Sequence, residues 1–174
     1  MRVFSSDELA QDLTVRSGAE RLRGAVSVLP LCYAPFFARL AALWQVPEDR
    51  VVSELSRASD VNSWRSALLC GMKKFDIDLG RPAGAQRSHL LHFAAGSRFP
   101  RHSHRGIERV LVLEGSYADA SGLRVRAGDE QTMAEGSEHE LSILGDRPCV
   151  AAVTEHGISF VGPLLRRWSG GLSR

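Results

Sequence analysis

The second half of the chain consists of short apolar runs separated by turn residues, and this pattern limits its fold more than any other feature. The runs are HLLHFAA, RVLVLEG, HELSIL, CVAAVT and ISFVG, with Gly, Asp and Ser residues between them. Several short strands at regular spacing, with turns between them, are typical of a β-sandwich or β-barrel. We therefore predict a mainly β domain over residues 88–174.

The first half has the periodicity of helices. The segment PFFARLAALWQV, residues 35–46, repeats apolar residues at helical spacing, and a second helix with its own apolar stripe is expected after Pro47. An earlier N-cap is expected at Ser6, before Asp7 and Glu8. The residues expected on the two apolar faces are Phe36, Phe37, Leu40, Leu43 and Trp44, then Val51, Val52 and Leu55. We predict a small helical region over residues 1–75, followed by a Gly- and Pro-rich linker over residues 76–87.

Composition excludes several classes of protein. A hydrophobic fraction of 44% and a charged fraction of 24% are ordinary for a globular chain and argue against disorder. The net charge of +2 gives no indication of nucleic-acid binding. No apolar run approaches the roughly 20 residues that cross a bilayer, and the N-terminus does not resemble a signal peptide. Cys32, Cys70 and Cys149 are odd in number and widely spaced, so we expect a reduced, cytoplasmic protein without disulfides.

Metal-ligating residues gather between residues 96 and 139. His102 and His104 are one residue apart, so on an extended strand both imidazoles point to the same face. Glu108 begins the next apolar run and is expected to face the interior, where a carboxylate needs a cation. His139 follows a turn that contains Gly136. Three nitrogens and one oxygen suit Zn, Fe, Mn, Ni, Cu or Co, and ligand type alone does not choose among them.

These residues stand at the spacing of the two cupin motifs, and the segment 88–165 resembles that superfamily. In the first motif five residues separate Gly96 from His102, three separate His104 from Glu108, and six more lead to Gly115. The second motif runs from Gly128 through Gly136 to His139. Two positions depart from the pattern, because Ala134 stands where it has Pro and Ile143 where it usually has Asn. The resemblance implies a C-terminal double-stranded β-helix, or jelly-roll, barrel.

The segment HSHRGIERVLVLEGSYADASGLRVRAGD is similar to ChrR-type cupins. In that family the cupin is the C-terminal half of an anti-sigma factor, a helical N-terminal domain holds the sigma factor, and the cupin takes part in the response to oxidants. The resemblance implies that His102, His104, Glu108 and His139 bind one divalent metal, with zinc expected first and iron, manganese or nickel as alternatives. It also implies a sigma factor as partner of residues 1–75.

The helical half departs from the zinc-containing anti-sigma pattern, which reads His, three residues, Cys, two residues, Cys. The corresponding register here is Val28, Cys32 and Pro35, and no histidine precedes His89. A sigma factor would therefore be bound without zinc. The helices can instead cap the barrel, covering the outer face that carries Leu111 and Leu113, and if they do not, this face is available for the homodimer that we expect.

The competing hypothesis is a metal-dependent enzyme, such as a dioxygenase, isomerase or decarboxylase acting on a small oxygenated substrate. A further acid or base near the metal would support it; Glu130, Glu138 and Tyr117 are the candidates, but we expect them at the surface. A third hypothesis is a protein that senses a small molecule at the metal without turning it over. His89, His92 and His156 are expected to be structural or surface histidines, with His89 and His92 on opposite faces of one strand, and Cys149 to be a buried inert thiol.

Overall fold

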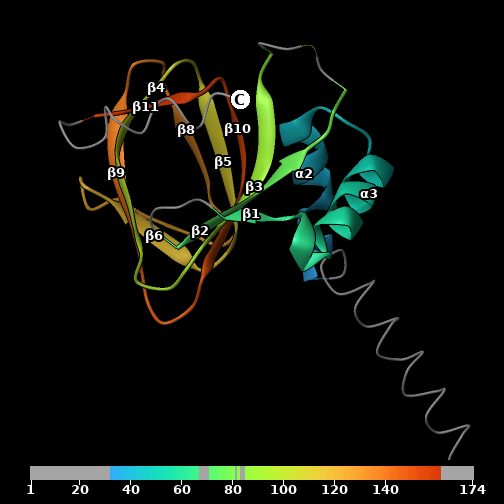
Figure 1. Cartoon of the computed structure of the whole chain (residues 1–174), viewed down its shortest axis with the longest axis horizontal. Helices are drawn as coiled ribbons and strands as arrows, with labels where there is room; N and C mark the ends of the chain where they lie inside the picture. Colours follow the sequence, from blue (N-terminus) through green and yellow to red (C-terminus); the bar gives the residue numbers. More distant parts are fainter. Residues whose placement is uncertain (1–31, 67–70, 81, 83–84, 162–174) are drawn as a thin grey trace, which may run out of the picture.

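The computed structural model describes residues 32–66, 71–80, 82 and 85–161, and it shows two antiparallel sheets that face each other, with short helices against the outside of one of them (Figure 1). The helix expected after Ser6 and the arginine-containing C-terminal end lie outside the described residues. The helical elements are η1 (Ala34–Phe36), α2 (Phe37–Trp44), α3 (Glu48–Ala58) and η2 (Val61–Ser63). No helix in the described part is long and apolar enough to cross a membrane.

The first sheet has the strand order β1-β2-β3-β10-β5-β8, and the second has the order β11-β4-β9-β6-β7. The strands of the first sheet are β1 (Arg65–Ser66), β2 (Met72–Ile77), β3 (Arg87–Phe93), β10 (Cys149–Glu155), β5 (Glu108–Glu114) and β8 (Glu130–Met133). Those of the second are β11 (Ile158–Phe160), β4 (Arg98–His104), β9 (Glu138–Ile143), β6 (Ser116–Asp119) and β7 (Arg124–Arg126). The apolar runs of the sequence form β3, β5, β9, β10 and β11, which confirms the mainly β prediction. Strands β1 and β2 lie upstream of residue 88, where we expected the barrel to begin.

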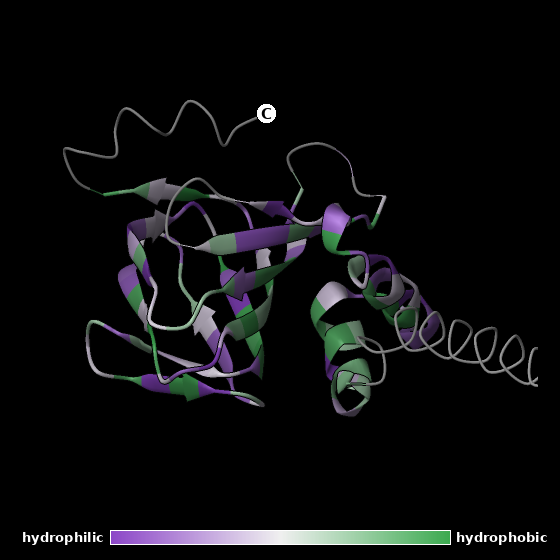
Figure 2. Ribbon diagram, turned by 60° about the horizontal axis from the view of Figure 1, so that its bottom comes forward, coloured by the Kyte–Doolittle hydropathy of each residue, from purple (hydrophilic) through white to green (hydrophobic). Residues whose placement is uncertain are grey.

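Alternation along the strands separates an outer from an inner core, and Figure 2 shows hydrophobic and hydrophilic residues alternating along several strands. On β5, Leu111 and Leu113 belong to the outer cluster, whereas Val110 and Val112 belong to the inner one. On β10, Val150 and Ala152 are outer, whereas Ala151 and Val153 are inner. Because these two central strands bury both faces, they read as nearly continuous apolar runs.

Helices α2 and α3 cover the outer face of the first sheet, so the chain itself supplies the cover that Leu111 and Leu113 need. Leu40, Leu43 and Trp44 of α2 are buried there, as the helical spacing predicted. The Tyr33 hydroxyl donates to Glu114 Oε1 at 2.7 Å, a second link between the helical region and the barrel.

The prediction that Val52 belongs to the buried stripe of α3 is wrong. Val51 and Leu55 are fully buried, but Val52 is 37% exposed, and Glu54 is fully buried. The Glu54 carboxylate is paired with Arg50 at 2.9 Å and Arg57 at 2.6 Å, both on the same helix. Burying this carboxylate is tolerated because both arginines compensate its charge.

Leu55→Ala tests the shared core of helices and barrel. Removing a fully buried side chain leaves a cavity, so we expect the free energy of unfolding to fall by about 3 kcal/mol. In urea denaturation, helical and barrel probes should lose stability together, because they share one core. Val52→Ala, on the exposed side of the same helix, is the control and should change stability by less than about 0.5 kcal/mol. A barrel transition unmoved by Leu55→Ala would contradict a common core.

Candidate metal centre

Three histidines predicted as ligands meet inside one end of the barrel. His102 and His104 lie at the end of β4, and His139 lies on the neighbouring strand β9, directly paired with His102 in the ladder. The three side chains offer ring nitrogens that all lie within 4.8 Å of one another. The Nε2 atoms of His102 and His139 are 3.0 Å apart. The histidines of the two motifs lie close together because β4 and β9 are antiparallel neighbours.

Glu108, the fourth predicted ligand, lies beside this cluster but outside the mutual 4.8 Å group. It is the first residue of β5 in the facing sheet, and its Oε2 is 3.6 Å from His104 Nδ1. Its side chain points to the inner face with Val110 and Val112, as alternation predicted. All four residues are buried, with exposed fractions of 2–8%.

Burial favours the neutral form of two imidazoles in the cluster, those of His102 and His139. Burial lowers the pKa of His102, while hydrogen bonding to the Pro100 carbonyl and the negative charges of Glu108 and Glu155 act in the opposite direction. Burial, followed by the neighbouring His102 and His104, lowers the pKa of His139 to about 4. A neutral imidazole keeps a lone pair, and metal binding requires this form.

The hydrogen bonds of the rings fit metal ligation. His102 Nδ1 lies 2.8 Å from the Pro100 carbonyl oxygen, to which its N–H donates, and this leaves the Nε2 lone pair directed at His139. Both ring nitrogens of His104 and Nδ1 of His139 are buried and have no hydrogen-bond partner among the described residues. Buried polar atoms are seldom left without partners, and a cation between the rings would satisfy those that face it. The donor set of three imidazoles and one carboxylate therefore suits a divalent metal.

The other acid and base candidates divide between the outside and the inside of the barrel. Glu130 is bound by Arg39 at 2.7 Å, and Glu138 by Arg101 at 2.9 Å, both partly exposed as expected. The surface expectation is wrong for Tyr117, which is 3% exposed within the inner cluster. Its hydroxyl donates to Gln131, and burial, with the nearby charge of Glu108, raises its pKa.

The remaining histidines are placed as predicted, but the contact between His89 and Glu155 was not expected from the sequence. His89 and His92 lie on opposite faces of β3: His92 contacts the Trp64 ring edge-on on the helical side, and His89 faces inward. His89 Nε2 is 3.2 Å from Glu155 Oε1 on β10, and both side chains are more than nine-tenths buried. The signal lay in the sequence, because Ala151, Val153 and Glu155 alternate on one face of the apolar run.

Glu155 is held as a carboxylate. Burial by itself would raise its pKa, but His89, Arg87 and Lys74 outweigh burial and bring the pKa down to about 2. Burial also lowers the pKa of His89 and that of Lys74, the latter to about 8. Arg87 Nη2 lies 3.1 Å from the same Oε1 atom.

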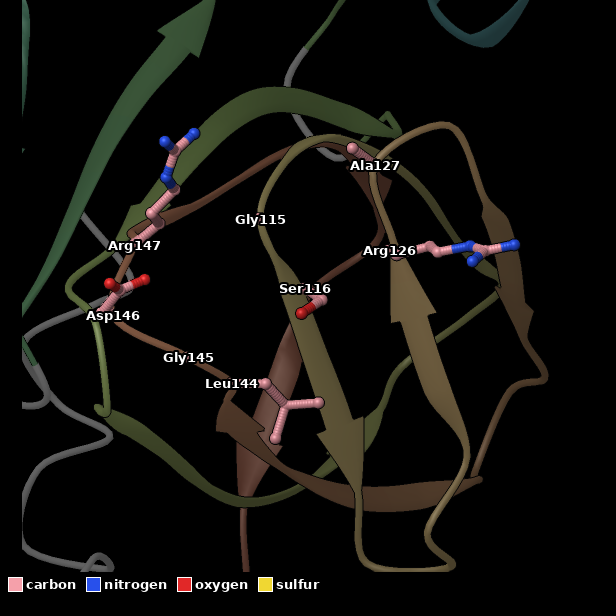
Figure 3. A pocket seen from close by; sticks show the side chains of 8 residues that line it. All are labelled: Gly115, Ser116, Arg126, Ala127, Leu144, Gly145, Asp146 and Arg147. Carbon is pink, nitrogen blue, oxygen red and sulfur yellow. The ribbon is translucent and has the colours of Figure 1, made fainter.

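A separate open pocket lies at the other end of β5, around Gly115 (Figure 3). Its volume is about 410 Å³, and its two arginines, Arg126 and Arg147, point away from each other. Gly115, the last residue of the first motif, has φ +67° there, and a Cβ atom would come within 2.3 Å of the Pro148 carbonyl oxygen. Gly115 is therefore required by the backbone conformation and by the close approach of Pro148, and it lies at the opposite end of β5 from the histidine cluster.

The fold and the histidine cluster together define a cupin barrel. The family described as ChrR Cupin-like domain matches residues 58–158, and this chain belongs to that family. The match includes β1 and β2, which lie before the expected boundary at residue 88. A comparison with curated protein sequences found no match.

Three of the solved structures similar to the chain are an anti-sigma complex, a dioxygenase and a cupin protein. A chain from Rhodobacter sphaeroides SigE in complex with the anti-sigma ChrR is 28% identical, with 53% of this chain and 47% of that chain covered and a TM-score of 0.46. An acetylacetone dioxygenase from Acinetobacter johnsonii is 16% identical (60% and 76% covered, TM-score 0.53), and an RmlC-like cupin protein from Ralstonia eutropha is 17% identical (60% and 71% covered, TM-score 0.52). The last two show the cupin fold. The chain spans about half the length of the SigE–ChrR chain that it matches.

The Glu155 carboxylate predicts an acid-sensitive contribution to stability. Its pKa of about 2 in the folded state lies below the usual 4.5, so this contribution is complete above pH 4.5 and is lost as the pH falls towards 2. With a chelator present to remove any metal contribution, we expect Glu155→Gln to be less stable than wild type at pH 5 in urea denaturation. Between pH 5 and pH 3 this difference should shrink by about 2 kcal/mol. An unchanged difference would show that Glu155 does not gain stability from ionisation.

Proposed function

We propose that this chain is a metal-binding regulator of the ChrR type, in which His102, His104, Glu108 and His139 hold one divalent metal. The observation that carries the metal is the cluster of three buried imidazoles, in which both ring nitrogens of His104 and Nδ1 of His139 have no hydrogen-bond partner in the described part of the chain. We expect zinc first, because it is redox-inactive and is commonly held by imidazole and carboxylate ligands. Iron, manganese and nickel are the alternatives. When bound, the metal supplies positive charge between the rings and positions for a small oxygen-bearing ligand.

The regulatory part of the proposal rests on family membership and on the ChrR-like sequence around the first motif. We propose a sigma factor as the partner of the N-terminal region. The apolar faces of α2 and α3 are packed on the barrel, so the partner would have to contact other residues of this region or displace the helices. The same packing means that a homodimer, which stays a prediction, needs a surface other than the helix-covered face.

The packing also suggests how the metal could influence the partner. β5 carries Glu108 on its inner face and Leu111 and Leu113 on its outer face, against the helices. A change at the metal that moves β5 would therefore reach α2 and α3 through one strand. Ligand binding at a zinc ion, or oxidation of a redox-active ion such as iron or manganese in the same site, would act in this way to loosen the helical region. We expect this to occur in a cytoplasmic protein.

A metal-dependent cupin enzyme is the second candidate function. The observation that favours it is the set of ionisable side chains inside the barrel, Tyr117, His89 and Glu155, beyond the expected ligands. A neighbouring sigma-factor gene would favour the regulator, and a metabolic operon would favour the enzyme.

Metal content tests the first part of the proposal. Mass spectrometry of protein purified without added metal should find about one divalent ion per chain in wild type and a severe loss in His102→Ala, because removing one ligand weakens the site. His156→Ala, which removes an exposed histidine outside the cluster, is the matched control and should keep its metal. Wild-type protein without metal, or full occupancy in a folded His102→Ala protein, would contradict the proposed centre.

Complex formation tests the second part. The full chain, co-expressed with a sigma factor encoded beside it, should elute with that factor in size-exclusion chromatography. Folded His102→Ala should still form the complex but alter its release by oxidants, because the expected partner surface lies in the N-terminal region and the trigger lies at the metal. Failure of wild type to bind the sigma factor would reject the regulator and leave the enzyme hypothesis. Loss of binding in folded His102→Ala would reject the division between trigger and partner surface.

A further inference from the structure

Polar side chains form a row across the inner face of the first sheet, beside the proposed metal centre. Asp76 on β2 is paired in the ladder with His89 on β3, and its carboxylate lies 3.8 Å from His89 Nδ1. His89 in turn contacts Glu155 at the end of β10. Asp76 is 45% exposed, whereas His89 and Glu155 are buried. The row therefore begins at solvent and runs into the barrel.

The inner end of this row meets the metal-ligand carboxylate. The register between β10 and β5 pairs Thr154 with Arg109, so one further step along the antiparallel ladder sets Glu155 opposite Glu108. Side chains directly opposite each other on one face have Cβ atoms roughly 5 Å apart. The charge of Glu155 is also felt at His102, across the barrel. Glu155 and Glu108 thus occupy adjoining strand ends, and Glu108 belongs to the proposed ligand set.

The two oxygens of Glu155 have different surroundings. Oε1 is contacted by His89 Nε2 at 3.2 Å and by Arg87 Nη2 at 3.1 Å. Oε2 is buried, in a side chain that is 8% exposed, and it has no hydrogen-bond partner among the residues that the structure describes. A buried carboxylate oxygen is a strong acceptor and costs stability when no donor reaches it. The basic neighbours therefore fix the charge of Glu155 through one oxygen and leave the other free to accept.

We propose that Glu155 Oε2 is the acceptor for a hydroxyl or N–H group of a small ligand whose oxygens bind the metal at His102, His104, Glu108 and His139. The inference rests on the proposed metal centre and adds the chemical class of its ligand. That ligand has a metal-chelating oxygen pair with a hydrogen-bond donor beside it, as in hydroxamates and hydroxy acids. A ligand that places a second carboxylate at this position would meet the negative charge of Glu155 and is disfavoured.

A matched pair of probes tests this acceptor. Acetohydroxamate and N-methylacetohydroxamate chelate metals through the same two oxygens, but only the first carries an N–H. Isothermal titration of the zinc-loaded full chain should show about tenfold tighter binding of acetohydroxamate in wild type, because a hydrogen bond to a charged acceptor is among the stronger ones. In Glu155→Gln, the preference should fall to about twofold or less. The bulk of the methyl group is unchanged between the two proteins, so it cancels in the comparison.

Two further variants complete the experiment. Asp76→Asn removes a carboxylate from the outer end of the same row and should keep the tenfold preference, which separates a direct contact from a general charge effect. Glu155→Asp keeps the charge that His89 and Arg87 require but withdraws the carboxylate by one methylene group, so it should lose the preference even if Glu155→Gln folds poorly.

The outcomes separate this inference from the proposed function. Zinc bound to wild type without any preference between the probes overturns the acceptor role of Glu155 and leaves the metal centre standing. A preference that persists in folded, zinc-loaded Glu155→Gln and Glu155→Asp also overturns it. Wild-type protein that holds no zinc, as measured on the same samples, overturns the metal centre and this inference together.

Discussion

The structure depends on two central strands, β5 and β10, that are buried on both faces. Their outer residues hold the helices, and their inner residues fill the barrel, so each strand belongs to two cores at once. This constraint fixes their register, because a slip by one residue would exchange the two faces. It also fixes where Glu108 and Glu155 can point. Both lie at strand ends on the inner face, and a carboxylate placed there must be compensated by a cation.

The two carboxylates are compensated in different ways, and this difference organises the interior. The charge of Glu155 is compensated by Arg87 and Lys74 on the neighbouring strands β3 and β2, and His89 contacts the same carboxylate. Among the described residues Glu108 pairs with no arginine or lysine, and its Oε2 lies 3.6 Å from His104 Nδ1 in the histidine cluster. In our proposal a bound metal ion compensates Glu108, whereas side chains of the protein compensate Glu155.

Much of this could be predicted from the sequence, because it follows from local alternation and spacing. The His-x-His pair, the inward face of Glu108 and the opposite faces of His89 and His92 all follow from a repeat of two residues along a strand. The contact between His89 and Glu155 was missed because it depends on β10 lying between β3 and β5, a non-local arrangement. Val52 was misplaced for a different reason: Arg50 and Arg57 compensate the charge of Glu54 and let it occupy the buried side of α3. Tyr117 was misplaced because its hydroxyl finds Gln131 inside the barrel.

The coordination shell of the bound metal tests the central claim most directly. X-ray absorption spectroscopy on the zinc-loaded full chain should show only nitrogen and oxygen neighbours at about 2.0–2.1 Å, with the outer-shell scattering of imidazole rings. Removal of His139 should reduce the imidazole component, because that ring lies 3.0 Å from its partner in the cluster. A sulfur neighbour at about 2.3 Å, or a shell without imidazole, would contradict the account, because it would place the metal away from His102, His104 and His139.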